Sequence, residues 1–175
     1  NPKSALLIGA GSYASAKDFL NRFPSSTMDV VEIDSKVTEI AKKYFNFPNT
    51  NHMSVIHEDG RLYLNNNKKK YDVIYNDSFS SYYSIPYQLT TREALAKINN
   101  ALTNNGVFII NLISAIDGNG SDFFKAEYKT FKSIFPNVYA FAVADTNDNK
   151  YAQNIILVGV KNKNFVPPDK EKFSK

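Results

Sequence analysis

Residues 5–14, ALLIGAGSYA, decide the fold of this chain. A short apolar run, ALLI, leads into Gly9-Ala10-Gly11, and residues 13–23 are compatible with a helix. An apolar run closed by glycines is typical of a buried parallel strand. Glycines let the backbone approach a ligand closely, and the N–H groups that begin the next helix face the same space. The pattern G-x-G-x-x-A, a relaxed dinucleotide fingerprint, predicts a nucleoside-type site, although a tight turn without ligand also fits it.

A second buried strand, residues 28–33 (MDVVEI), brings an acid to its carboxyl end. Glu32 lies 23 residues after Gly9. This is close to the spacing of roughly 20 residues that precedes an acid holding the ribose hydroxyls. A carboxylate suits a ribose because it accepts hydrogen bonds and donates none. We therefore predict that Glu32 and the adjacent Ile33 line the same site as the glycine turn.

Composition indicates one globular domain over residues 1–162, followed by a polar tail over residues 163–175. The chain has 175 residues, a net charge of +4 and no cysteine, which excludes disulfides and fits a cytoplasmic protein. No apolar run approaches the roughly 18 residues that span a bilayer, so we expect no membrane contact by this domain. Because the chain starts without Met, we expect it to be a piece of a longer protein.

The charged residues point to neither a metal nor a nucleic acid as partner. The basic run over residues 68–70 follows three asparagines and precedes a strand, which favours a solvated turn over a phosphate-binding patch. His52 and His57 are the only histidines, and they stand in no clustered metal-ligand spacing. We therefore predict no metal site and no nucleic-acid partner.

The remaining sequence predicts strands that alternate with helices. Ser35 is the expected N-cap of a helix over residues 35–44, and a turn is expected at residues 104–106. The apolar face of this helix is expected to consist of Val37, Ile40, Ala41 and Tyr44. Further helices are predicted over residues 62–64, 91–102 and 122–135, and further strands over residues 52–56, 71–75, 107–113, 138–144 and 154–160.

This order of elements predicts an α/β fold. Strands that alternate with helices form a parallel, doubly wound sheet, whereas the last two strands are joined by a turn and must be antiparallel. The predicted architecture is the Rossmann-like class I S-adenosylmethionine-dependent methyltransferase fold. It has a mostly parallel seven-stranded sheet with a C-terminal antiparallel hairpin.

Four of the predicted strands end in residues suited to a ligand. In such sheets ligands bind beyond the carboxyl ends of the strands, where Gly9, Glu32, Asp59 and Asp77 would meet. Asp59, with Gly60 beside it, is placed to accept from the exocyclic amine of an adenine. A second interpretation is that Asp59 caps a short helix, and both roles are compatible.

Asp77 is the predicted catalytic residue. An amine that attacks a sulfonium cofactor must lose a proton, and a carboxylate at this strand end can orient the amine and accept that proton. The loop over residues 78–86 is expected to act as a lid, with aromatic faces that suit a cation. The predicted residues of this region are Asp77 and Ser78 on the cofactor side, and Tyr82, Tyr83, Tyr87 and Gln88 on the substrate side.

From residue 3 to about residue 161 the chain resembles the catalytic domain of the spermidine synthase family, the aminopropyltransferases. LLIGAGSYA resembles the family's glycine motif, VVEID its second-strand motif, HEDGR its adenine-side motif and YDVIYNDS its catalytic strand. The segments DSFSSYYSIPYQLTTREA, NLIS and YAQNIILVG are closer to the spermidine synthase-like subgroup, some of whose members are fused behind membrane segments.

The resemblance implies transfer of an aminopropyl group from decarboxylated S-adenosylmethionine to a small-molecule amine, with methylthioadenosine as product. It implies that Glu32 holds the ribose, Asp59 the adenine amine, and that Asp77 is catalytic. It also implies an N-terminal β-stranded domain and a homodimer. Two family aspartates, one in the glycine motif and one three residues after the catalytic one, are Ser12 and Ser80 here.

Three alternatives stay open at this point. The first is a methyltransferase that uses intact S-adenosylmethionine, and the second is a nucleoside-binding domain without turnover. The third, a nicotinamide-dependent dehydrogenase, is disfavoured by the terminal hairpin and by the acid after the third strand.

Overall fold

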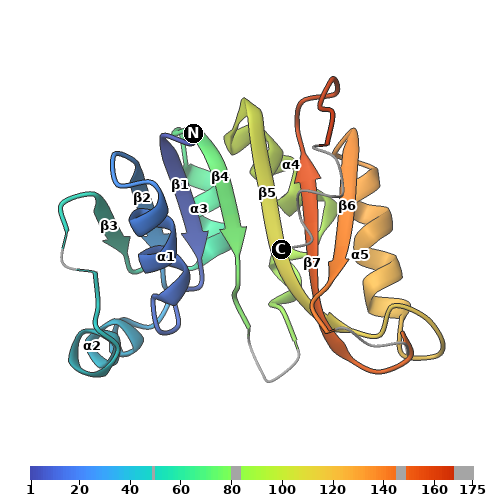
Figure 1. Ribbon diagram of the computed structural model, residues 1–175, viewed down its shortest axis with the longest axis horizontal. Coiled ribbons are helices and arrows are strands. Elements are labelled where there is room, and N and C mark those ends of the chain that lie inside the picture. The colour runs from blue at the N-terminus through green and yellow to red at the C-terminus, as the bar shows by residue number, and fades with distance from the viewer. Residues whose placement is uncertain (49, 80–83, 145–148, 168–175) are drawn as a thin grey trace.

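The computed structural model describes residues 1–48, 50–79, 84–144 and 149–167. Seven strands form one sheet in the order β3-β2-β1-β4-β5-β7-β6 (Figure 1). The pairs from β3 to β5 are parallel, and β7 runs antiparallel to both β5 and β6. The predicted α/β sheet with its terminal antiparallel hairpin is confirmed. The hairpin folds back so that β7, the last strand in the chain, lies between β5 and β6.

The elements follow the predicted order. The strands are β1 (Ser4–Ile8), β2 (Thr27–Val31), β3 (Met53–Ile56), β4 (Tyr71–Asn76), β5 (Leu102–Ser114), β6 (Asn137–Ala142) and β7 (Gln153–Val160). The helices are α1 (Ala14–Arg22), α2 (Ser35–Tyr44), α3 (Gly60–Asn66), α4 (Arg92–Ala101) and α5 (Asp122–Lys132), with a 3₁₀ turn η1 (Tyr87–Leu89) before α4. None of the helices in the described ranges combines the length and the apolar character needed to cross a bilayer.

The sheet has an apolar core on each face, as parallel strands require. In β1, Ala5 and Leu7 belong to one core, together with Phe19 of α1. Leu6 and Ile8 point to the opposite face and join a larger core with residues of α3, α4 and α5. Figure 1 shows α1 in front of the sheet and α3, α4 and α5 behind it. This two-sided burial holds the carboxyl ends of the strands at one fixed edge.

Helix α2 corrects two expectations. Its N-cap is Asp34, whose side chain accepts a hydrogen bond from the Lys36 backbone N–H at 2.8 Å, and not Ser35. Of the expected apolar face, Ala41 is buried, but Ile40 is 51% exposed and Tyr44 is 66% exposed. The inward position is taken by a polar residue, Thr38, because its hydroxyl has hydrogen-bond partners inside the fold.

The predicted turn at residues 104–106 is part of a longer strand. Strand β5 begins at Leu102, which pairs with Tyr71, and the next pairing joins Val107 to Val73. The strand therefore carries extra residues between two paired positions, which is the geometry of a bulge. A turn and a bulge use the same Asn-rich and Gly-rich sequence, and the pairing with β4 decides between them.

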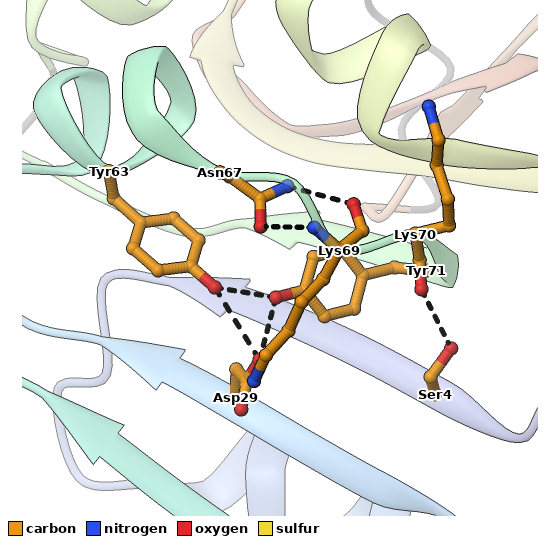
Figure 2. A network of polar contacts seen from close by, with 7 residues as sticks. All are labelled: Ser4, Asp29, Tyr63, Asn67, Lys69, Lys70 and Tyr71. Carbon is orange, nitrogen blue, oxygen red and sulfur yellow. Dashed lines mark hydrogen bonds and ion pairs between the residues drawn. The ribbon is translucent and has the colours of Figure 1, made fainter.

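The basic run over residues 68–70 is more than a solvated turn. Lys69 Nζ lies 2.7 Å from Oδ2 of the buried Asp29, and Lys70 Nζ donates to the Asn100 carbonyl. Figure 2 shows Asp29 of β2 at the centre of a network that also receives Tyr71 (2.6 Å) and Tyr63 (3.4 Å). Burial raises the pKa of the Tyr71 phenol, so the hydroxyl stays a donor. The run therefore fastens the α3–β4 connection to β2.

Helix α5 carries a buried carboxyl group, that of Glu127, at a position away from the carboxyl ends of the parallel strands. Glu127 is buried, and its Oε2 has no hydrogen-bond partner in the described part of the chain. Burial raises the pKa of Glu127 from 4.5 to about 7. Burial of an unpaired carboxylate is unfavourable, so the folded protein holds this proton more tightly than the unfolded chain.

We expect Glu127→Gln to increase the free energy of unfolding by about 1–2 kcal/mol near pH ~8, because the neutral isostere carries no buried charge. In the wild type, the folded state binds more protons than the unfolded state between pH 4.5 and about 7. Stability therefore falls as pH rises through that window, and the variant should lose this slope. Denaturant unfolding at several pH values checks it, with the exposed Glu39→Gln on α2 as control. A variant less stable than wild type near pH ~8 would contradict the account.

Candidate functional site

A cavity of about 380 Å³ lies at the carboxyl ends of β1 to β4, and we call it the strand-end cleft. Its walls come from the connections that follow these four strands and from η1. The lining residues are Ile8, Gly9, Ala10, Gly11, Val31, Glu32, Ile33, Val37, Glu58, Asp59, Gly60, Asp77, Ser78, Phe79, Pro86, Gln88 and Leu89. Parallel strands place such connections at one edge, which is where α/β sheets bind ligands.

The cleft brings together most of the residues predicted from the sequence. Its lining includes Gly9, Ala10, Gly11, Glu32, Ile33, Asp59, Gly60, Asp77 and Ser78 from the predicted cofactor side, and Gln88 from the predicted substrate side. Tyr87 is 81% exposed and is not among the described lining residues. Tyr82, Tyr83 and Ser80 lie outside the described residues, and the lid over residues 78–86 stays a prediction.

Several lining residues were missed by the sequence reasoning. Ile8 and Val31 are the last residues of β1 and β2, and Leu89 comes from η1. Glu58 directly precedes the predicted Asp59, so strand-end position alone could have suggested it. Val37 lies in the first turn of α2 and was predicted only as part of the apolar face of that helix. Phe79 and Pro86 belong to the loop over residues 78–86, which was predicted as a lid without naming either residue.

Gly9 is required by the close approach of two connections. Its φ of 84° lies in the left-handed region, which side chains other than glycine rarely adopt. A Cβ at this position would lie 2.7 Å from the Cα of Ser78 and 2.9 Å from the carbonyl oxygen of Asp77. The glycine turn after β1 therefore lies directly against the loop after β4, which holds the candidate catalytic residue.

Glu32 is held by the backbone on both sides. Its Oε2 accepts a hydrogen bond from the Ala10 N–H at 2.9 Å, and its Oε1 accepts one from the Asp34 N–H at 3.0 Å. A carboxylate has about four acceptor sites, so two further hydrogen bonds can be accepted from a ligand in the cleft. The buried carboxylate is thus fixed in place before any ligand arrives.

Asp59 combines a structural contact with a place in the cleft. Its Oδ1 accepts a hydrogen bond from the Leu62 N–H at 2.9 Å and so caps α3. Next to it, Arg61 Nη1 donates to the Gln88 carbonyl at 3.1 Å and to Thr91 Oγ1 at 3.2 Å. The capping interpretation of Asp59 is confirmed, and its second oxygen is not used by that bond.

Asp77 follows β4, and both its backbone and its side chain are held. Its N–H donates to the Ile8 carbonyl at 3.0 Å, and its Oδ1 accepts from Asn111 Nδ2 of β5 at 3.2 Å. The preceding Asn76 is buried and accepts from the backbone N–H and the hydroxyl of Ser78, at 3.2 and 2.6 Å. Two carboxamides therefore fix the start of this loop, and neither was predicted.

The cleft carries one sign of charge. Its ionisable lining residues in the described ranges are Glu32, Glu58, Asp59 and Asp77, with no lysine, arginine or histidine among them. No group of acidic and histidine side chains in the described ranges has the arrangement of a metal site. An acidic, partly enclosed cavity concentrates cations and disfavours anionic ligands.

The fold is shared with solved enzymes. A probable spermidine synthase from Corynebacterium glutamicum ATCC 13032 superimposes with a TM-score of 0.84 at 22% identity, over 98% of this chain and 61% of that one. Human methyltransferase-like protein 13, in complex with SAH, gives a TM-score of 0.80 at 26% identity, over 99% of this chain and 78% of that one. The predicted class I methyltransferase-type architecture is confirmed.

A curated relative agrees with these structures. A polyamine aminopropyltransferase from Vibrio vulnificus (strain CMCP6) is 33% identical over 152 residues, which cover 85% of this chain. The chain spans about half (49%) of the length of that relative. The protein-family model described as the spermine/spermidine synthase domain matches residues 1–168. Because that match covers nearly the whole sequence, the chain belongs to the spermine/spermidine synthase family.

Proposed function

We propose that the protein transfers an aminopropyl group from decarboxylated S-adenosylmethionine to a small-molecule amine. The observation that carries this proposal is the meeting of Glu32, Asp59 and Asp77 in one cleft, where every ionisable lining residue that the structure describes is acidic. Membership of the family and the similarity to a polyamine aminopropyltransferase support it.

The nucleoside end of the cofactor would lie along the connections after β1 to β3. Glu32 has two acceptor positions left for the ribose hydroxyls, because its backbone contacts use only two of about four. Asp59 has one oxygen beyond its helix-capping bond for the adenine amine. The turn at Gly9 and Gly11 allows the close backbone approach that a bound nucleoside needs.

The charge of the cleft favours the decarboxylated cofactor over the intact one. Decarboxylated S-adenosylmethionine carries a sulfonium and an ammonium and lacks a carboxylate. Intact S-adenosylmethionine would bring its carboxylate into a cavity that holds four acidic side chains and, in the described ranges, no basic one. Like charges in a low-dielectric cavity repel more strongly than in water, so the dication is the better fit.

Asp77 would supply the base for the transfer. The acceptor nitrogen attacks the aminopropyl carbon that is bonded to the sulfonium sulfur. A C–N bond forms there while the bond between that carbon and sulfur breaks. The electron pair of the broken bond stays on sulfur, which leaves as the neutral thioether methylthioadenosine. The proton lost by the amine passes to the Asp77 carboxylate, whose other oxygen is already held by Asn111.

Product analysis tests the function. Full-length protein would be incubated with decarboxylated or intact S-adenosylmethionine and a panel of diamines and monoamines, and the products identified by mass spectrometry. We expect methylthioadenosine and an aminopropylated amine in equal amounts, and only with the decarboxylated cofactor. Methylated products formed from the intact cofactor would contradict the proposal.

A methyltransferase is the second candidate, and two observations favour it. The chain is 26% identical to human methyltransferase-like protein 13, whose structure contains SAH. In addition, Ser12 and Ser80 stand where aminopropyltransferases are expected to carry aspartates. The N-terminal domain, the homodimer, the cytoplasmic location and the tail over residues 163–175 all stay predictions.

We expect Glu32→Gln to weaken binding of S-adenosylmethionine and its decarboxylated form by about 1–3 kcal/mol, the effect of losing a charged hydrogen-bond acceptor. Isothermal titration calorimetry measures it. Glu58→Gln is the matched control, because it removes the same charge from the same cleft at a residue with no assigned role. Equal losses in the two variants would mean that only the negative potential matters, and would remove the ribose assignment.

A further inference from the structure

The turn after β1 contains three residues in the left-handed backbone region, and one of them is not a glycine. Gly9, Gly11 and Tyr13 all have positive φ values, of 84°, 49° and 62°. For the two glycines this conformation is ordinary, whereas for tyrosine it is strained. Such strain persists only where surrounding contacts hold the residue in place.

The contacts that hold Tyr13 come from two other connections. Its fully buried ring packs on Phe47 with centroids 4.7 Å apart, and its hydroxyl lies 2.6 Å from Thr38 Oγ1. Thr38 Oγ1 in turn lies 3.0 Å from His57 Nε2. Tyr13 is the N-cap residue that precedes α1, Thr38 belongs to α2 and His57 follows β3. One chain of side chains therefore joins the connections that supply Gly9, Glu32 and Asp59.

Two backbone hydrogen bonds connect Tyr13 to Glu32, the acid proposed to hold the ribose. The Tyr13 N–H donates to the Ala10 carbonyl at 2.7 Å, and the Ala10 N–H donates to Glu32 Oε2 at 2.9 Å. The two bonds involve the two peptide groups on either side of the Ala10 Cα, so a shift of Tyr13 would disturb the residue whose N–H orients Glu32. Burial raises the pKa of the Tyr13 phenol, and the nearby Glu32 charge raises it further, so the hydroxyl keeps its proton.

We propose that Tyr13 is a positioning residue that preorganises the strand-end cleft for adenosine, acting through Thr38 and His57. Gly9 and Gly11 have no side chains that could anchor the turn. The buried side chain of Tyr13 anchors it through its contacts with Phe47 and Thr38. Without its hydroxyl bond, the turn spends part of its time in relaxed conformations that do not bind. Apparent affinity falls by the fraction of the population that is lost. The ligand class rests on the proposed function, whereas the ordering of the turn does not.

Isosteric variants separate this role from general stability. Tyr13→Phe removes the tyrosine hydroxyl. Thr38→Val removes the threonine hydroxyl that contacts both Tyr13 and His57, whereas Thr38→Ser keeps it. Tyr71→Phe is the matched control, because it deletes a buried, hydrogen-bonded phenol that belongs to the Asp29 network and not to the cleft. The probes are methylthioadenosine and S-adenosylmethionine, measured by calorimetry alongside thermal unfolding without ligand.

We expect Tyr13→Phe to weaken binding of both probes roughly three- to tenfold, as for the loss of one hydrogen bond. A variant that combines Tyr13→Phe with Thr38→Val should bind no more weakly than Thr38→Val alone, since both changes break the same chain of hydrogen bonds. Thr38→Ser should bind like wild type, and Tyr71→Phe should lose stability without losing affinity. If Tyr13→Phe lowers only the unfolding temperature and leaves affinity unchanged, the residue is merely structural and the proposal is wrong.

A ligand-free measurement keeps the two proposals apart. Hydrogen exchange should be faster at the Ala10 and Tyr13 amides in Tyr13→Phe than in wild type, and unchanged there in Tyr71→Phe. Unchanged exchange at those amides would overturn the positioning role. If exchange changes as expected while the wild type binds neither probe, then the positioning role stands and the proposed ligand is wrong.

Discussion

Asp77→Asn is expected to lower turnover by about 10²- to 10⁴-fold, the usual loss on removal of a general base, with cofactor affinity within about twofold of wild type. The amide keeps the shape of the carboxylate but cannot accept the proton that the attacking amine must lose. Its oxygen would still accept from Asn111 Nδ2, which lies 3.2 Å from the native Asp77 Oδ1. In that arrangement the N–H groups of the new amide point toward the attacking amine. Both groups are hydrogen-bond donors, so the amide can neither accept the proton nor orient the amine.

Steady-state kinetics in full-length protein, with calorimetry for the cofactor, checks this result. Asp59→Asn is the control, because it neutralises another carboxylate of the same cleft on the adenine side. We expect the two variants to show opposite patterns, with Asp59→Asn losing affinity and Asp77→Asn losing turnover. A variant with undiminished turnover would show that Asp77 is not the base, and Glu58 of the same cleft would then be the next carboxylate to test.

Asp29→Ala is expected to lower the free energy of unfolding by about 3–4 kcal/mol, through loss of charge-assisted hydrogen bonds to buried groups. Figure 2 shows that the Tyr63 and Tyr71 hydroxyls and the Lys69 ammonium all converge on Asp29. The two hydroxyls contact each other at 2.5 Å, so one proton can be shared between them. The hydroxyl proton of the other tyrosine is accepted by the Asp29 carboxylate. Without that carboxylate, one buried tyrosine hydroxyl has no acceptor for its proton.

Chemical denaturation measures this loss, with Asp18→Ala as the matched control. Asp18 pairs with Arg22 at 2.8 Å, nearly the distance of the Asp29–Lys69 pair, but both of its side chains are largely exposed. Exposed pairs contribute about 0–1 kcal/mol, so the control should be close to wild type. Similar losses in the two variants would show that the buried hydroxyls add nothing to the Asp29 pair.

The sequence was sufficient for the fold and for the location of the cleft. Apolar runs, turn residues and helix spacing are local patterns, and they predicted each strand of the sheet and the terminal hairpin. The strand-end rule then placed Gly9, Glu32, Asp59 and Asp77 together, because the carboxyl ends of parallel strands meet at one edge. Their proximity is confirmed, whereas their chemical roles stay predictions.

The sequence was not sufficient for partnerships between distant residues. Periodicity assigned the inward face of α2 to Val37, Ile40, Ala41 and Tyr44, of which Ala41 is buried but Ile40 and Tyr44 are exposed. Thr38 points inward instead, because Tyr13 and His57 offer it hydrogen bonds. A lysine run predicted a solvated turn, yet Lys69 meets Asp29 across 40 residues of sequence. Tyr87 was expected near the substrate, yet it faces solvent.

The sequence by itself thus determined the α/β class, the order of the elements and the edge of the sheet that carries the cleft. These follow from hydrophobic period and turn chemistry, which act over a few neighbouring residues. Only the tertiary structure decided that Asn111 holds Asp77 and that Tyr13 reaches Thr38, pairs separated by 34 and 25 residues. Such contacts depend on strand order, register and the packing of whole helices, and a buried polar side chain takes whichever partner that packing brings within hydrogen-bond distance.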